Sequence, residues 1–156
     1  MLSLLPTDDT YIRPSFPDTP AGWAPELVTD DSPVTDFLIR FNVTGTGGCT
    51  VSDAKLRLTV GPNAYDRSEH GGDFHGVGTD WTESTATWNN APAAGPTVAT
   101  LGPVALNSTY MVDVSPLVTG DGPVAIRVSS TSADAAKYLS KEGSATEGPR
   151  LQVTCS

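Results

Sequence analysis

The stretch DFLIRFNV, residues 36–43, decides the fold class of this chain. Successive side chains of a β-strand point to opposite faces, so one face of this segment carries Phe37, Ile39, Phe41 and Val43. The opposite face includes the charged residue Arg40. An apolar residue at every second position predicts an antiparallel strand with one face in the core and the other away from it.

The same period of two recurs along the sequence. It is clearest in residues 54–60 (AKLRLTV), 110–114 (YMVDV), 124–130 (VAIRVSS) and 149–153 (PRLQV). Shorter strands are predicted within residues 9–13, 25–29, 97–102 and 135–141, and in VGTDW (77–81) with the residues before it. Turn sequences such as GTGG (45–48) and TGDGP (119–123) separate them, and VSPLV (114–118) is the one helical candidate. About ten short strands predict an all-β fold, a two-sheet antiparallel β-sandwich of the jelly-roll kind.

The length favours a single domain over residues 1–156, because a chain of this size can bury roughly 70% of its unfolded surface. The opening MLSLLPT (1–7) is too short in its apolar run for a signal peptide or a membrane span. We therefore expect residues 1–7 to be flexible or added by cloning, and the domain to belong to a larger secreted protein.

The net charge of −9 comes from 18 acidic and 9 basic residues. It repels nucleic acids and anionic membranes, so we expect neither as a partner. It attracts calcium and cationic groups, although solubility alone also explains an acidic surface.

The two cysteines, Cys49 and Cys155, do not have the spacing of a metal site. Cys49 precedes one predicted strand and Cys155 ends the last one. A disulfide forms if these ends meet, and it would place the protein in an oxidising, extracellular setting. Two unrelated buried thiols are the alternative.

Acidic side chains near the first strand are candidate calcium ligands. Calcium prefers six to eight oxygen atoms, and sandwich domains often hold it where the first strand meets a loop. The candidates are Asp8, Asp9 and Asp31, although neither acidic segment matches an EF-hand loop. Strand capping and solvation are the alternatives, and no other cofactor is expected.

His70 and His75, with neighbouring carboxylates, also resemble metal ligands, but a Gly-Gly pair between them is more typical of a hairpin or bulge.

No signature of a catalytic nucleophile or of a phosphate-binding loop occurs in the sequence. Carboxylate pairs, which glycosidases use, arise by chance in so acidic a chain. We therefore predict that the protein is not an enzyme.

Three arginines, Arg40, Arg57 and Arg127, each lie opposite the apolar residues of a predicted strand. An arginine fork binds a carboxylate through two parallel hydrogen bonds, a geometry suited to uronic-acid sugars. A shared basic strip for an acidic glycan is one interpretation, and local pairing with aspartates is the other. Further candidate glycan ligands are Lys137, Lys141, Tyr138, Tyr65 and His75.

Several segments together resemble a known family. They are DTYIR (9–13), FLIRFNV (37–43), SDAKLRLTV (52–60), WTESTATWNNAP (81–92), YMVDVSPLV (110–118), YLSKEG (138–143) and PRLQVT (149–154). In this order they are similar to the DNRLRE-type domains, grouped with carbohydrate-binding module family 96, over about residues 8–154. The most specific part is the fingerprint Trp81, Glu83, Trp88 and Asn89. The resemblance implies a non-catalytic β-sandwich module of bacterial extracellular proteins, associated with alginate lyases and with alginate-type ligands.

Two tryptophans of this fingerprint, Trp81 and Trp88, invite a sugar-stacking interpretation. A chain with few aromatic residues needs such large rings to fill its core, and a fingerprint shared by a family fits a shared fold better than a ligand site. We therefore predict that both rings are core or loop-pinning residues, and that Glu83 accepts hydrogen bonds from backbone N–H groups of its loop.

Two segments depart from the family pattern, residues 15–27 with Trp23 and residues 64–78 with both histidines. Loops of this kind usually determine ligand specificity, so the ligand cannot be copied from the family. The resulting hypothesis is an extracellular, monomeric carbohydrate-binding module for an acidic polysaccharide such as alginate, appended to a secreted enzyme or surface protein. A structural or adhesive spacer domain without glycan affinity is the alternative.

Overall fold

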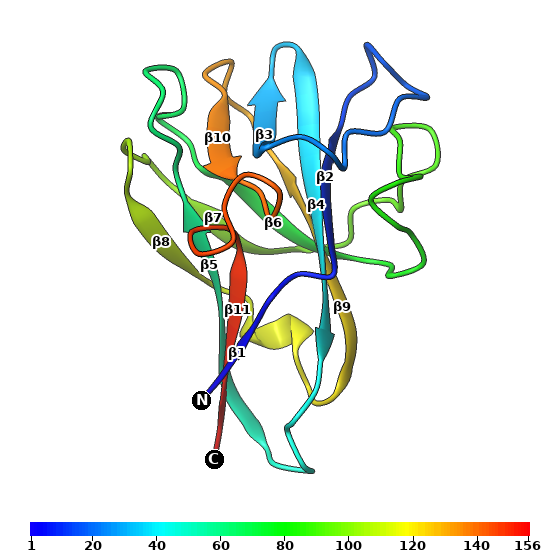
Figure 1. Ribbon diagram of the computed structural model, residues 1–156, viewed down its shortest axis with the longest axis vertical. Helices are drawn as coiled ribbons and strands as arrows, with labels where there is room; N and C mark the ends of the chain where they lie inside the picture. The colour runs from blue at the N-terminus through cyan, green and yellow to red at the C-terminus, as the bar shows by residue number, and fades with distance from the viewer.

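The alternating segments form eleven strands in two antiparallel sheets (Figure 1). The computed structural model describes residues 1–156. Four strands form one sheet in the order β1-β11-β5-β8, and the other seven form the second sheet, in the order β10-β3-β4-β9-β6-β7 with β2 also paired to β4. The strands are β1 (Leu2–Leu4), β2 (Asp8–Ile12), β3 (Glu26–Asp31), β4 (Val34–Val43), β5 (Val51–Thr59), β6 (Gly72–Val77), β7 (Thr97–Leu101), β8 (Thr109–Asp113), β9 (Gly122–Ser129), β10 (Ala136–Leu139) and β11 (Arg150–Cys155).

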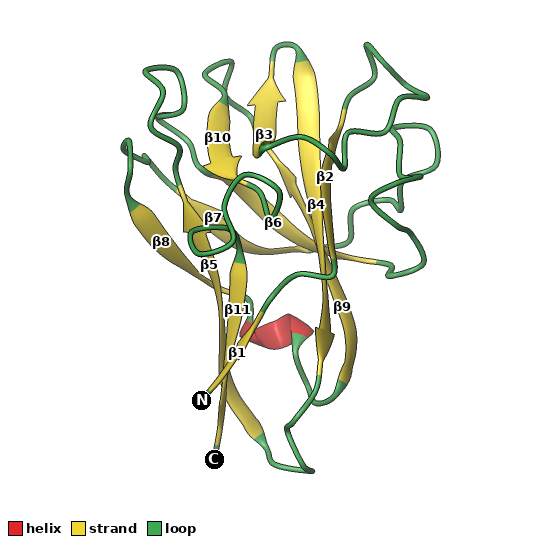
Figure 2. Ribbon diagram, in the orientation of Figure 1, coloured by secondary structure: helices red, strands yellow, loops and turns green.

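The predicted β-sandwich is therefore confirmed, with one more strand than expected. The predicted helical turn is the short 3₁₀ element η1 (Ser115–Leu117), drawn in red in Figure 2. No helix in the structure is both long and apolar enough to cross a membrane.

Strand β4 is the centre of the larger sheet. It pairs with β9 over Phe37–Val43, while its other edge is shared by β3 near Val34 and by β2 over Asp36–Arg40. Its inner face carries the alternating apolar residues of the DFLIRFNV segment, all fully buried. They meet the inner faces of β5 and β11 in a core of 21 buried residues between the sheets.

The outer face of the larger sheet is covered by the segment 78–96, which we call the covering loop. Leu38 points outward from β4 yet is fully buried, because Trp81 and Ala86 of the covering loop pack over it together with Ile12 and Ala125. Strand β4 is thus buried on both faces, which explains why Leu38 interrupts an otherwise polar outer face.

Two segments fold differently from what the sequence led us to expect. Residues Leu2–Leu4 are not flexible: they form β1, which pairs with Leu151–Val153 of β11 and packs on the core. The predicted strand at VGTDW ends at Val77, because the chain leaves the sheet there and Gly78 begins the covering loop.

The disulfide between Cys49 and Cys155 is present, and it closes a loop with a sequence separation of 106. Cys49 lies in the connection from β4 to β5, which crosses from one sheet to the other, and Cys155 ends β11. The bond therefore ties the last strand to the turn that joins the two sheets.

The disulfide yields a test of stability. A chain in which Cys49 and Cys155 are both serine should lose roughly 2–5 kcal/mol of unfolding free energy, since a cross-link over so long a loop restricts the unfolded chain. Urea unfolding with and without reductant measures the loss. Reductant should destabilise the wild type and leave the double variant unchanged; equal curves for the two proteins without reductant would contradict the role assigned to the bond.

Candidate functional site

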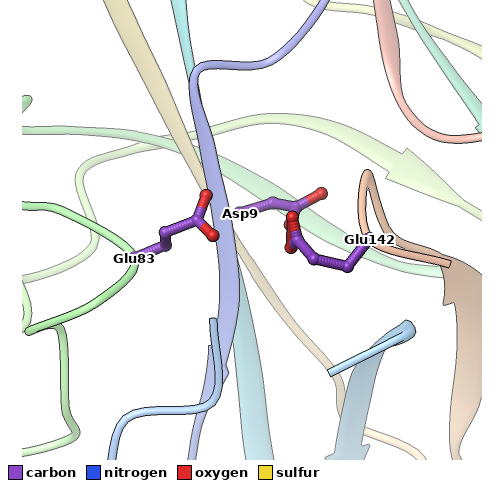
Figure 3. Close-up of side chains that lie close together, drawn as sticks. All are labelled: Asp9, Glu83 and Glu142. Carbon is purple, nitrogen blue, oxygen red and sulfur yellow. The ribbon is translucent and has the colours of Figure 1, made fainter. Parts of the chain in front are cut away.

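Three carboxylates from distant parts of the sequence converge beside β2. Asp9 belongs to β2, Glu83 to the covering loop and Glu142 to the loop after β10, and one oxygen of each lies within 4.8 Å of the others (Figure 3). We call these three residues the carboxylate cluster. No other group of three or more histidine, cysteine or carboxylate side chains comes this close together.

Asp9 is the buried member of the cluster. Its neighbour across the sheet is Ile39, so its side chain points toward the inner side of the larger sheet, and the residue is 1% exposed. Oδ2 accepts a hydrogen bond of 2.8 Å from the backbone N–H of Lys141, whereas Oδ1 has no partner. Burial raises the pKa of Asp9 to about 8; the Lys141 bond opposes this rise, and Glu142 and Glu83 add to it.

A single cation, the Lys141 ammonium, pairs with two members of the cluster. Its Nζ lies 2.8 Å from Glu83 Oε1 and 2.6 Å from Glu142 Oε2. Burial lowers the pKa of Lys141, but the bonds to Glu142 and Glu83 outweigh it and raise the pKa above its ordinary value. Glu83 was predicted to accept backbone N–H groups; its carboxylate instead binds Lys141.

The cluster suits a hard cation. It offers carboxylate oxygens from three loops or strands, one of them buried and without a partner, and this is the donor set that calcium prefers. Asp8 is next to the cluster, where its Oδ2 accepts the Glu83 backbone N–H at 3.0 Å. Of the three aspartates predicted as ligands, only Asp9 is a member, because Asp31 is an exposed residue at the far end of β3.

The three outward arginines do not form one basic strip. Arg40 and Arg127 lie on the outer face of the larger sheet, whereas Arg57 lies on β5 in the other sheet. They therefore occupy opposite sides of the sandwich. The sequence could not show this, because alternation gives the face of a strand but not the sheet to which it belongs.

Arg40 and Arg127 anchor the covering loop. Arg40 Nε donates to the Thr79 carbonyl at 3.1 Å, and Arg127 Nη1 donates to the Pro92 carbonyl at 2.9 Å. Arg127 also pairs with Asp36 at 2.8 Å, and its guanidinium lies 5.1 Å from the centre of the Trp88 ring. The donors that would bind a sugar carboxylate are thus bound to the protein itself.

Arg57 serves the loop between β10 and β11 in the same way. Its Nη2 donates to the carbonyls of Thr146 at 2.7 Å and Gly148 at 3.2 Å.

Three of the four fingerprint residues, Trp81, Trp88 and Asn89, hold the covering loop. The Trp81 ring is 8% exposed and its Nε1 donates to the Gly78 carbonyl at 3.1 Å, while Trp88 packs at the edge of the same outer cluster. Asn89 Nδ2 reaches Asp18 at 2.9 Å and so joins the covering loop to the segment before β3.

The side chains of two other candidate glycan ligands, Tyr138 and His75, form contacts within the protein. Tyr138 is completely buried, packs edge-on against Phe37 and donates to the Gly71 carbonyl, so no dissolved sugar reaches its ring. His75 contacts the Gly95 carbonyl and Ser129 Oγ, each at 3.0 Å, and His70 pairs with Asp73 at 3.3 Å. The histidines therefore do not share a metal site.

Tyr65 is 83% exposed and lines none of the grooves.

Two cations line one shallow groove of about 240 Å³ over β3 and β10. Lys137 was among the predicted ligands, and Arg13 was missed because it lies just past the end of β2, outside the alternating pattern. Neither cation forms an ion pair, and the Arg13 guanidinium lies 4.4 Å from the centre of the Phe16 ring and 5.4 Å from that of Tyr11. We call this the Arg13–Lys137 groove.

Comparison with known proteins gives one result that bears on function. The family model described as carbohydrate-binding module family 96 matches residues 1–155. No curated protein matches the chain.

The raised pKa of Asp9 predicts a pH dependence of stability. In calcium-free buffer the unfolding free energy should fall as pH rises from about 4 to about 8, because the folded state holds the Asp9 proton over this range and the unfolded state has lost it. Asp9→Asn should flatten this decrease, while Asp31→Asn, a change at an exposed position, should leave it as in the wild type. Urea unfolding at several pH values measures both slopes, and identical slopes for wild type and Asp9→Asn would refute the assignment.

Proposed function

The chain belongs to carbohydrate-binding module family 96 and is a carbohydrate-binding module, and we propose that its ligand is an acidic polysaccharide such as alginate. The observation that supports an acidic ligand is the Arg13–Lys137 groove, where two cations without carboxylate partners line the same surface. The other outward arginines hold loops. Arg67 is exposed and forms no ion pair, but it lines no groove, so Arg13 and Lys137 are the cations without ion pairs that share a groove.

The chemistry of the groove suits a chain of uronates. A guanidinium can bind a carboxylate through two parallel hydrogen bonds, and the Lys137 ammonium supplies a second positive charge. The rings of Tyr11 and Phe16 hold the Arg13 guanidinium by cation–π contact, which reduces the entropy that binding must remove. Phe16 is 51% exposed, so its ring is also open to a sugar.

Two carboxylates, Glu26 and Asp30, lie in the same groove and oppose an anionic ligand. Asp30 has a structural task, since its Oδ1 accepts the Ser32 N–H at 3.1 Å in the turn before β4. No ion pair involves Glu26. Because surface charges are screened beyond ~8 Å at physiological salt, this local balance matters more than the net charge of −9.

We further propose that the module is non-catalytic and monomeric, and that it is part of an extracellular protein, where it holds an enzyme or a cell surface to the polysaccharide. The disulfide is consistent with an oxidising compartment. A structural spacer without glycan affinity is the competing hypothesis, and it assigns no task to Arg13 or Lys137.

The two hypotheses differ in a titration. Arg13→Ala and Lys137→Ala should each weaken the binding of alginate oligosaccharides about tenfold or more, since each removes a charged hydrogen-bond donor. Arg67→Ala, a matched change at an exposed arginine outside the groove, should have little effect, and Glu26→Gln should strengthen binding by removing repulsion. Isothermal titration calorimetry at low and high salt measures these changes. If folded wild-type protein binds no polyuronate, the acidic-ligand proposal fails and the spacer hypothesis gains support.

We also propose that the carboxylate cluster holds a structural calcium ion. Asp9, Glu83 and Glu142 would supply its protein oxygens, and the unpartnered Oδ1 of Asp9 is the observation that favours it. The ion would replace Lys141 as the counter-charge. It would also join β2, the covering loop and the loop after β10, which no disulfide links to one another.

Calcium should raise the melting temperature by roughly 5–10 °C when it is present at about 100 times its dissociation constant. EDTA should reverse the shift, because the ion binds only the folded cluster. Glu142→Gln should reduce the shift by removing one charged ligand, and Asp31→Asn should retain it. Differential scanning calorimetry gives the answer, and equal melting temperatures in calcium and in EDTA would exclude the site.

A further inference from the structure

We propose that Trp23 and the hollow beside it form a second sugar subsite, which takes an uncharged pyranose residue of the polysaccharide. This inference rests on the proposed function and sharpens it. Among acidic polysaccharides, it favours those that contain both uronate and uncharged residues over alginate, the example given with the proposed function.

Trp23 is the exposed tip of a rigid turn. Trp23 is 73% exposed, whereas Ala21 and Ala24, before and after it in the turn, are 7% and 4% exposed. The turn is closed by a hydrogen bond of 3.1 Å from the Ala24 N–H to the Ala21 carbonyl. The large exposed ring is therefore held in one place by buried neighbours.

Close backbone packing fixes the turn on both sides. A Cβ atom at Gly22 would collide with the backbone carbonyl of Glu83, so the turn lies directly against the covering loop. On the other side, Ser140 Oγ donates to the Ala24 carbonyl at 2.6 Å, and the Ser140 N–H donates to that of Pro25 at 3.1 Å. An aromatic ring displayed on so fixed a backbone loses little entropy on binding.

The hollow beside the ring has the chemistry of a sugar site. It measures about 380 Å³ and is lined by Pro20, Gly22, Trp23, Glu83, Ser84 and Glu142. The C–H face of a pyranose packs on an indole ring, and its hydroxyl groups donate to carboxylates. Lys141 contacts Oε1 of Glu83 and leaves Oε2 of Glu83 to accept such a bond.

The same carboxylates determine which sugar fits. In the calcium-free protein, Glu83 and Glu142 place two carboxylates against one lysine at this point, so a uronate would be repelled. An uncharged ring meets no such penalty and supplies the hydroxyl donors that the carboxylates lack.

The hollow and the Arg13–Lys137 groove lie along one ribbon of two strands. Lys137 of β10 pairs with Val28 of β3, and Leu139 pairs with Glu26. Beyond this last pair, one strand leads to Glu142 and the other leads back to Trp23. Trp23 and Glu26 are three residues apart, at most about 10 Å. One glycan chain can therefore place a uronate in the groove and an uncharged neighbour on Trp23.

The test compares three oligosaccharides in EDTA: hyaluronan, which alternates glucuronate with an uncharged residue; alginate, which is uronate throughout; and cellohexaose, which is uncharged. Wild-type protein should bind the hyaluronan oligosaccharide most tightly. Trp23→Ala should weaken that binding about tenfold, and Tyr65→Ala, the matched loss of an exposed aromatic ring, should leave it unchanged.

Intrinsic fluorescence supplies a readout that needs no variant. Trp23 is the only tryptophan with a largely exposed ring, so acrylamide quenching reports mainly on it, and bound sugar should protect it. Binding without such protection, or equal affinities of Trp23→Ala and Tyr65→Ala, would overturn the subsite. Tighter binding of alginate than of hyaluronan would contradict the proposal that the subsite takes an uncharged sugar residue.

The outcomes separate this inference from the proposed function. If Arg13→Ala and Lys137→Ala abolish binding while Trp23→Ala does not, the acidic-ligand proposal stands and the subsite falls. If cellohexaose protects Trp23 and the cation variants bind as the wild type does, the subsite stands and the acidic-ligand proposal fails. If folded protein binds none of the three sugars, both fall.

Discussion

The burial of Leu38 is the constraint on which the functional surface depends. Exposing the apolar side chain of Leu38 to water would cost free energy, and in this chain the covering loop packs over it. Once the loop is in place, Arg40 and Arg127 become its anchors, Glu83 is brought against β2, and the turn at Gly22 gains the surface on which it packs. The carboxylate cluster and the turn that displays Trp23 both use the covering loop, which also buries Leu38.

The charged side chains of the molecule have two different roles. Most arginines on the sheets bind the carbonyls of loops that cross their own face, so their positive charge serves the fold. The carboxylates gather where three segments meet and are balanced incompletely by Lys141. What is left for a ligand is small: two cations over aromatic rings in one groove, and one tryptophan beside an acidic hollow.

The sequence predicted the fold well and the site in part. Alternation in DFLIRFNV and in the other alternating segments of the chain determines which face of each strand is apolar. The two cysteines at strand ends predicted the disulfide correctly. The loop-pinning role of Trp81 was also predictable, because a small sandwich has few other large rings. Alternation does not assign strands to sheets, however, so Arg57 could not be separated from Arg40 and Arg127. Nor could it bring Glu142 to Asp9 across 133 positions of sequence, or show that Tyr138 points into the core.

The pairing of β1 with β11 has a mechanical consequence. These antiparallel neighbours place the two ends of the chain side by side at one end of the sandwich, as the labels N and C in Figure 1 show. Tension applied through both ends would peel β1 from β11 one residue pair at a time, which is the weak direction for a pair of strands. Strand β11 itself would stay in place, because the disulfide at Cys155, next to the C-terminus, transfers the load on that end to Cys49 and to the turn between the sheets. A module attached to an insoluble polymer could thus yield a short length of chain under drag while the groove proposed for the glycan, on the other sheet, stays folded.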